Sequence, residues 1–150
     1  MRKGVDEMKL KRFILPIMLL LLVAALVSCE NAISSDEAKV LTGDMFECIE
    51  KELYEDAASR MHPSRKADAD TLRSYIEELE QDTGADFSDG IEIEYQSGFS
   101  SALYDSEVKG SRYGIDYVVK VGEYTFDVEI DVVRNDDGFG IYDIEFDLDD

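Results

Sequence analysis

The chain is poor in the residue types on which most catalytic and metal sites depend. Its 150 residues include one His, two Cys, two Pro and no Trp, and 15 Lys and Arg stand against 35 Asp and Glu. A single imidazole leaves little for His-based catalysis or for a His/Cys metal centre. The formal charge of −20 argues against nucleic acid as a partner, because phosphate binding needs a basic face.

What the sequence does contain begins with a targeting signal. Five basic residues precede an apolar run over residues 13–27, an order typical of a secretory signal peptide. A transmembrane helix needs roughly 20 apolar residues, whereas this run has 15, contains Pro16 and stops at Ser28. We therefore expect residues 1–28 to be a signal peptide rather than a membrane-spanning anchor.

The signal ends in a short motif, Leu26-Val27-Ser28-Cys29, that resembles the lipobox of bacterial lipoproteins. In that family a diacylglyceryl group with fatty acyl chains such as palmitate is attached to the Cys thiol, and a peptidase cuts just before it. The resemblance implies cleavage between Ser28 and Cys29, lipidation of Cys29 and a short tether over residues 29–35. The alternative is an unmodified Cys29 after an ordinary signal peptide.

The same resemblance implies where the protein is held. Acyl chains anchor through about 0.8 kcal/mol per buried methylene, so we expect the chain on the extracytoplasmic face of a bacterial cell membrane, in the cell envelope. From Cys29 onward the chain has ten Lys and Arg and 33 Asp and Glu, a formal charge of −23. Such a surface is repelled by anionic lipid, so membrane contact is expected through Cys29.

The pattern of residues 36–150 predicts a single α+β domain that begins with helices. Apolar residues at helical spacing predict a first helix from about Ser35 to Met61, which a break near residues 52–55 would divide. A second helix is predicted from about Asp70, its expected cap, to Asp82, with Gly84 ending it.

Beyond Gly90 the apolar period changes to two, which indicates strands. The expected strands cover residues 91–96, about 102–109, 115–121, 124–130 and 142–148. They form an antiparallel meander with one apolar face, and that face is the place where the helices can pack.

Two turns set the expected strand register. Gly122-Glu123 favours a two-residue type II′ hairpin that pairs Val121 with Tyr124. For the next turn we expect a three-residue loop with Gly138 in the left-handed position, which pairs Asn135 with Phe139 and keeps the apolar residues on one face. This register places three acidic pairs opposite each other: Asp131 and Asp143, Glu129 and Glu145, Asp127 and Asp147.

This order of elements resembles the nuclear transport factor 2-like (cystatin-like) superfamily, and in particular small lipoproteins that carry such a domain. The resemblance covers roughly residues 35–149. It implies a curved sheet of four to five antiparallel strands that forms a cone with the helices and can enclose a pocket. Some members of the superfamily use such a pocket for catalysis and many use it for binding.

Four tyrosines fall on the apolar phase of the expected strands. As a functional site they would line a pocket with aromatic rings and a few phenols to orient a ligand. The alternative is plain core, with each hydroxyl reaching the rim or a backbone partner. The four candidates are Tyr95, Tyr117, Tyr124 and Tyr142.

Six acidic residues occupy the opposite phase of the last two strands. Clustered carboxylates are the ligands that Ca²⁺ prefers, but the sequence has no Asp-rich loop with calcium-binding spacing. We therefore expect a solvated acidic face without a metal or other cofactor. The weak metal candidates are Asp127, Glu129, Asp131, Asp143, Glu145 and Asp147.

The remaining chemistry-bearing side chains have structural interpretations. His62 precedes Pro63 at a helix end, where it would interact with the helix dipole, and we assign no catalytic residue. Cys48 is expected to be a buried free thiol. Glu52 and Asp56 are the helix-borne acids that an enzyme could still place inside the cone.

These patterns lead to one expected function and two alternatives. We expect a membrane-anchored extracytoplasmic lipoprotein whose non-catalytic domain binds a small ligand, a peptide or an envelope protein. The alternatives are a small isomerase or hydrolase that uses the cone pocket, and a cation-binding structural module. An ionisable side chain with a hydrogen-bonded partner inside the cone would favour the enzyme.

Overall fold

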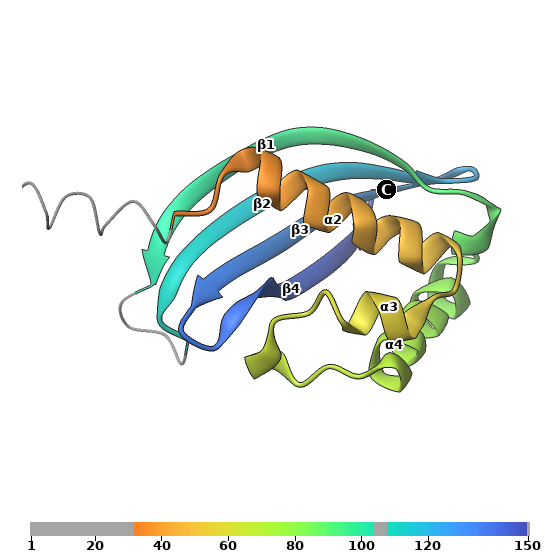
Figure 1. The fold of residues 1–150 in the computed structure, drawn as a ribbon. Helices are drawn as coiled ribbons and strands as arrows, with labels where there is room; N and C mark the ends of the chain where they lie inside the picture. The colour runs from red at the N-terminus through yellow and green to blue at the C-terminus, as the bar shows by residue number, and fades with distance from the viewer. Residues whose placement is uncertain (1–31, 104–107, 150) are drawn as a thin grey trace, which may run out of the picture. The chain divides into compact units, whose positions relative to one another are not determined.

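Three helices followed by a four-stranded antiparallel sheet form the unit of residues 33–150 in the computed structural model (Figure 1). The structure describes residues 32–103 and 108–149, so the predicted cleavage and lipidation site at Ser28 and Cys29 lies outside it. The predicted α+β class is confirmed. The elements are α2 (Ser35–Glu50), α3 (Tyr54–Ala58), the 3-10 turn η1 (Pro63–Arg65), α4 (Ala69–Thr83), the 3-10 turn η2 (Phe87–Asp89), β1 (Glu92–Leu103), β2 (Gly110–Val121), β3 (Tyr124–Asn135) and β4 (Gly138–Leu148).

Helix α2 starts from a capping box and ends earlier than its apolar pattern predicts. The Ser34 side chain accepts from the backbone N–H of Glu37, and the Glu37 carboxylate accepts from that of Ser34, which satisfies two free donors of the first turn. The helix does not run unbroken to Met61: the chain turns after Glu50, next to the break considered near residues 52–55, and Glu52 takes a left-handed φ of 54°. Leu53, which continues the apolar spacing of α2 beyond this turn, is exposed.

Helix α4 matches its prediction except at its first turn. Asp68, and not Asp70, caps it by accepting from the backbone N–H of Thr71. Gly84 ends it as predicted, in the left-handed conformation at φ 85°. Leu72 and Ile76 carry the buried face.

The strands follow each other in the order β1-β2-β3-β4. The β2–β3 hairpin turns at Gly122, with φ 60°, and pairs Val121 with Tyr124 as predicted. The separate strand expected over about residues 102–109 falls partly on residues 104–107, which lie outside the described residues; Ala102 and Leu103 form the end of β1, and β2 begins at Gly110. A bulge between Tyr95 and Ser97 interrupts the β1–β2 pairing.

The β3–β4 register is as predicted, but the device that produces it is different. Asn135 pairs with Gly138 across a two-residue turn, so the expected three-residue loop and the pairing of Asn135 with Phe139 are wrong. A bulge opposite Asp131 and Val132 inserts Tyr142 and shifts the register by one residue. Beyond that bulge the three acidic pairs face each other as predicted: Asp131 and Asp143, Glu129 and Glu145, Asp127 and Asp147.

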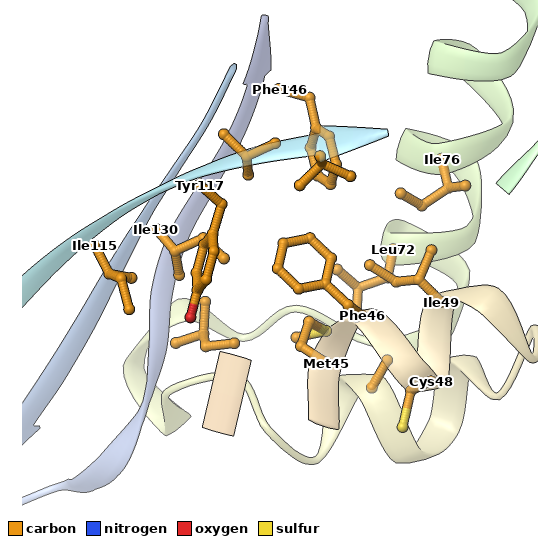
Figure 2. Close-up of a cluster of buried hydrophobic side chains, with 14 of the residues drawn as sticks. Met45, Phe46, Cys48, Ile49, Leu72, Ile76, Ile115, Tyr117, Ile130 and Phe146 are labelled. Atoms are coloured by element: carbon orange, nitrogen blue, oxygen red, sulfur yellow. The ribbon is translucent and has the colours of Figure 1, made fainter. Parts of the chain in front are cut away.

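The core lies between the helices and one face of the sheet, and Figure 2 shows the rings of Phe46, Tyr117 and Phe146 among its aliphatic side chains. Phe46 of α2 meets Tyr117 of β2 edge to face at 5.5 Å between centroids, and Phe146 of β4 packs against it at 6.3 Å. Such pairs contribute about 0.5–1.5 kcal/mol beyond their burial. Within the described residues, no helix has the length and apolar character that a membrane crossing requires.

Candidate functional site

The structure does not gather the four predicted tyrosines into one group. Tyr117 is buried in the core, and Tyr124 is half-buried with its hydroxyl beside Gly84. Tyr95 lies next to Tyr117, at 6.2 Å between ring centroids, but 39% of it is exposed. Tyr142 occupies the β4 bulge, and its ring lies 6.2 Å from that of His62.

The buried tyrosine is held by a residue that the sequence pattern did not single out. The Tyr117 phenol and the Thr42 hydroxyl of α2 lie 2.6 Å apart, and Thr42 also donates to the carbonyl of Ala38 at 2.9 Å. Because the Thr42 proton is used there, the phenol donates the shared hydrogen bond. Burial raises the pKa of Tyr117, so this hydroxyl acts as a neutral tie between α2 and β2.

His62 is buried, and its ring connects two loops. Its Nδ1 accepts from the Ser64 backbone N–H at 3.2 Å and lies 2.6 Å from the Ser64 hydroxyl, while Nε2 lies 3.0 Å from the Asn135 side-chain oxygen. A ring that accepts at Nδ1 carries its proton at Nε2, which donates to Asn135. The predicted helix-dipole contact is wrong, because α3 ends at Ala58 and His62 caps the start of η1.

Backbone pairing reinforces this connection. The N–H of His62 donates to Ile141 of β4 at 2.7 Å, and the N–H of Ile141 donates to Arg60 at 2.9 Å. The chain before η1 thus adds a short parallel bridge to the free side of β4. Both ring nitrogens of His62 are used in holding this segment in place.

The other candidate groups lie outside any shared site. Cys48 is buried as predicted, and burial raises the pKa of its thiol against the opposing effect of the Arg60 guanidinium. A thiol with a raised pKa is a weak nucleophile near neutral pH. Glu52 and Asp56 are both exposed and do not face the core.

The acidic face is partly neutralised by two arginines. Arg112 of β2 pairs with Asp131, and Arg65 of η1 pairs with Asp143 at 3.2 Å. Glu129, Glu145, Asp127 and Asp147 are exposed on the same face. Among the described residues, no three His, Cys, Asp or Glu side chains come together in a group that could hold a metal ion.

The most unusual surface is β1, a strand at the edge of the sheet. Ile93 is 42% exposed and Tyr95 39%, although their partners on β2, Val119 and Tyr117, are buried. Phe99 is 51% exposed. We call the exposed residues Ile93, Tyr95 and Phe99 the β1 surface.

The bulge in β1 places the β1 surface on both faces of the sheet. Before the bulge, Ile93 and Tyr95 lie on the face that the helices cover, whereas Phe99 lies on the acidic face opposite Gly114. The Phe99 ring lies so close over Gly114 that a Cβ there would come within 2.8 Å of it. The guanidinium of Arg112 stands 5.4 Å from the centre of the same ring.

The sequence pattern identifies Tyr95 as a candidate site residue, but it does not identify Ile93 or Phe99. The alternation of Ile93 and Tyr95 with Glu92 and Glu94 is equally typical of a strand with one buried side, so exposure could not be read from it. Gly114 was the available signal, since glycine inside a strand often marks a close approach.

No protein family model, curated protein or solved structure matches this chain.

Proposed function

We propose that the protein is a bacterial lipoprotein, held on the extracytoplasmic face of the cell membrane through lipid on Cys29, whose folded domain is a non-catalytic binding or accessory module. The support for the anchor is the basic segment, the apolar run of residues 13–27 and the lipobox-like Leu26–Cys29. The proposed domain fold is nuclear transport factor 2-like. Its support is the order of elements, with helices before a curved antiparallel meander.

The observation that carries the binding role is the β1 surface. Large apolar side chains on a sheet edge are costly to leave in water, each worth about 1.5–3 kcal/mol when fully buried. Exposed apolar groups gathered beside polar ones are typical of interaction sites. In this chain Ile93 and Tyr95 lie on the same face of the edge strand β1, although their partners on its neighbour β2, Val119 and Tyr117, are buried.

The hydrogen bonds of the buried polar side chains favour a binding role for the domain over a catalytic one. Among the described residues, the buried side chains that carry polar atoms include Thr42, His62 and the phenols of Tyr54, Tyr113 and Tyr117. Thr42 ties α2 to β2, and His62 ties the chain before η1 to the β3–β4 turn. An acid or base inside the domain needs a free proton-transfer atom facing a substrate, and these two use theirs structurally.

Metabolic labelling with a radioactive or clickable fatty acid tests the anchor. The full-length chain should incorporate the label and partition into detergent, and Cys29→Ala should remove the label and leave an unprocessed precursor. Cys48→Ala is the matched control, because it changes the other cysteine and should leave labelling unchanged. Labelling of Cys29→Ala at the level of the unmodified chain would contradict the lipoprotein assignment.

A further inference from the structure

The two edges of the sheet differ in what covers them. On β4 the segment before η1 forms a backbone bridge between Met61 and Ile141. On β1 no described residue pairs with the side of the strand that faces away from β2. The outer N–H and C=O groups of an edge strand are a ready template for another extended chain.

The first part of β1 presents an alternating pattern to such a chain. Ile93 and Tyr95 face the side of the helices, and Glu92 and Glu94 face the acidic side. A strand added to β1 would place one row of its side chains beside the two apolar residues and the other row beside the two carboxylates. The sequence of the added strand should therefore alternate between residues that contact Ile93 and Tyr95 and residues that contact Glu92 and Glu94.

The charges on each side of β1 indicate which residues the added strand should place beside Glu92 and Glu94. Glu92 and Glu94 are both exposed, and although Lys120 of β2 lies opposite Glu92, the carboxylates of this face outnumber it, with Asp116 on β2 and the acidic pairs on β3 and β4. On the other side, the Lys39 ammonium lies 3.5 Å from the centre of the Tyr95 ring, which disfavours a cationic side chain there. Basic residues beside the glutamates and apolar residues beside Ile93 and Tyr95 satisfy both sides.

The same charges argue against a second copy of this chain as the occupant. From Cys29 onward each copy carries a formal charge of −23, and two such surfaces repel each other. The negative electrostatic potential of the domain attracts a basic partner, whereas it repels a second copy of the chain.

Resting on the proposed binding role of the domain, we propose that the outer edge of β1 over residues 92–95 binds an extended, basic polypeptide segment by strand addition. Lysine or arginine at alternate positions pairs with Glu92 and Glu94, and the intervening apolar residues cover Ile93 and Tyr95. Phe99, beyond the bulge and on the acidic face, gives the end of the segment an apolar contact.

Peptide binding to the full chain in detergent micelles, measured by fluorescence anisotropy at physiological ionic strength, tests this proposal. The probe is a short labelled peptide of alternating Lys and Val, and it should bind. A peptide of alternating Glu and Val, and a Lys–Val peptide with its alternate backbone nitrogens methylated, should not bind, because the first has the wrong charge and the second lacks donors.

Two double variants locate the site. Glu92→Gln with Glu94→Gln should weaken binding of the Lys–Val peptide about tenfold or more, a change of about 1.4 kcal/mol. Asp127→Asn with Asp147→Asn removes the same charge from the same face two and three strands away, and should change binding less than about threefold, an effect expected of general screening alone. Circular dichroism of each variant verifies that the fold is retained.

Three other outcomes would contradict the proposal, and each points to a different explanation. Equal losses in both double variants, or unchanged binding of the methylated peptide, would mean general electrostatic attraction rather than strand addition. Self-association of the domain through β1, seen by ultracentrifugation, would make a second copy the occupant. No binding of the Lys–Val peptide would reject this partner class, while fatty-acid labelling of Cys29 would still report separately on the lipoprotein assignment.

Discussion

Thr42 of α2 and Tyr117 of β2 share a 2.6 Å hydrogen bond in the core, between residues 75 positions apart in the sequence. Thr42 accepts this bond and donates its own proton to Ala38. The two partners are therefore unequal, since Thr42 keeps a partner without Tyr117, whereas the phenol loses its acceptor without Thr42.

This inequality predicts an order of stability. Thr42→Val leaves a buried phenol unpaired and should cost about 1–3 kcal/mol of unfolding free energy. Tyr117→Phe removes the phenol itself and should cost less, because the Thr42 hydroxyl still donates to Ala38. Urea unfolding of the two variants measures both values, and a larger cost for Tyr117→Phe would contradict the assigned donor and acceptor.

Gly140 should be far less tolerant of a side chain than Gly114. A Cβ on Gly140 would lie 2.6 Å from the backbone nitrogen of His62, and a Cβ on Gly114 would lie 2.8 Å from the ring of Phe99. The ring can swing away because it is half exposed, whereas the His62 backbone is fixed by its bond to Ile141.

We therefore expect Gly140→Ala to destabilise the fold by about 1–3 kcal/mol or more, as overpacking does. Gly114→Ala should cost less. Thermal unfolding compares the two, and equal melting temperatures would mean that the chain before η1 is not held against β4 as described.

Glu37 predicts a pH dependence with a defined sign. Its hydrogen bond with Arg134, followed by those with Ser34, lowers the pKa of its carboxyl from 4.5 to about 2. Because the folded pKa is the lower one, the ionised group stabilises the fold above pH 4.5, and this contribution is lost as the pH falls towards 2.

The variant Glu37→Gln isolates this effect, since the amide oxygen can still accept from Ser34 in the capping box. Its urea midpoint should lie below that of the unmodified chain at neutral pH, and the gap should narrow as the pH is lowered below 4.5. A gap of constant size over that range would contradict the lowered pKa.

The acidic pairs on β3 and β4 predict a gain from removing one charge. Glu129 and Glu145 face each other directly, and like charges in that position cost a sheet roughly 0.2–1 kcal/mol. Glu145→Gln should therefore raise the melting temperature. Asp143→Asn should not, because Asp143 pairs with Arg65 at 3.2 Å.

Salt provides a second measurement of the same repulsion. Added NaCl screens exposed charges, so it should raise the melting temperature of the unmodified chain. The rise should be smaller for Glu145→Gln. A melting temperature that falls with NaCl would mean that the stabilising ion pairs, such as those of Arg65, Arg112 and Arg134, outweigh the repulsion.

The sequence predicted the class of the fold because its apolar periods are local. The switch from helical spacing to alternation after Gly90, the end of α4 at Gly84 and the hairpin at Gly122 each depend on a few neighbouring residues. The pattern allowed a break near residues 52–55, but it did not predict a helix that ends at Glu50, because Ala57 and Met61 continue the apolar spacing on the far side of the turn.

The β3–β4 register shows what local patterns leave open. Burial of the apolar residues required a one-residue shift, and both an extra turn residue and a bulge provide one. The chain uses a bulge at Tyr142, where the ring has His62 and Arg65 as neighbours. Those neighbours come from a loop about 80 positions earlier, so the residues around Tyr142 in the sequence do not predict the contact.

The exposed state of β1 was equally hidden from the sequence. Ile93 and Tyr95 are 42% and 39% exposed, and the alternation of residues along a strand does not tell whether another element covers it. Composition could exclude classes of partner, but the position of the β1 surface needed the assembled sheet.

Mass spectrometry of the N-terminal peptide of the membrane-extracted protein tests the central claim most directly. The account predicts that the mature chain begins at Cys29, with a diacylglyceryl group on its sulfur and residues 1–28 removed. A chain that retains residues 1–28, or one that is cut elsewhere and carries an unmodified Cys29, would contradict it.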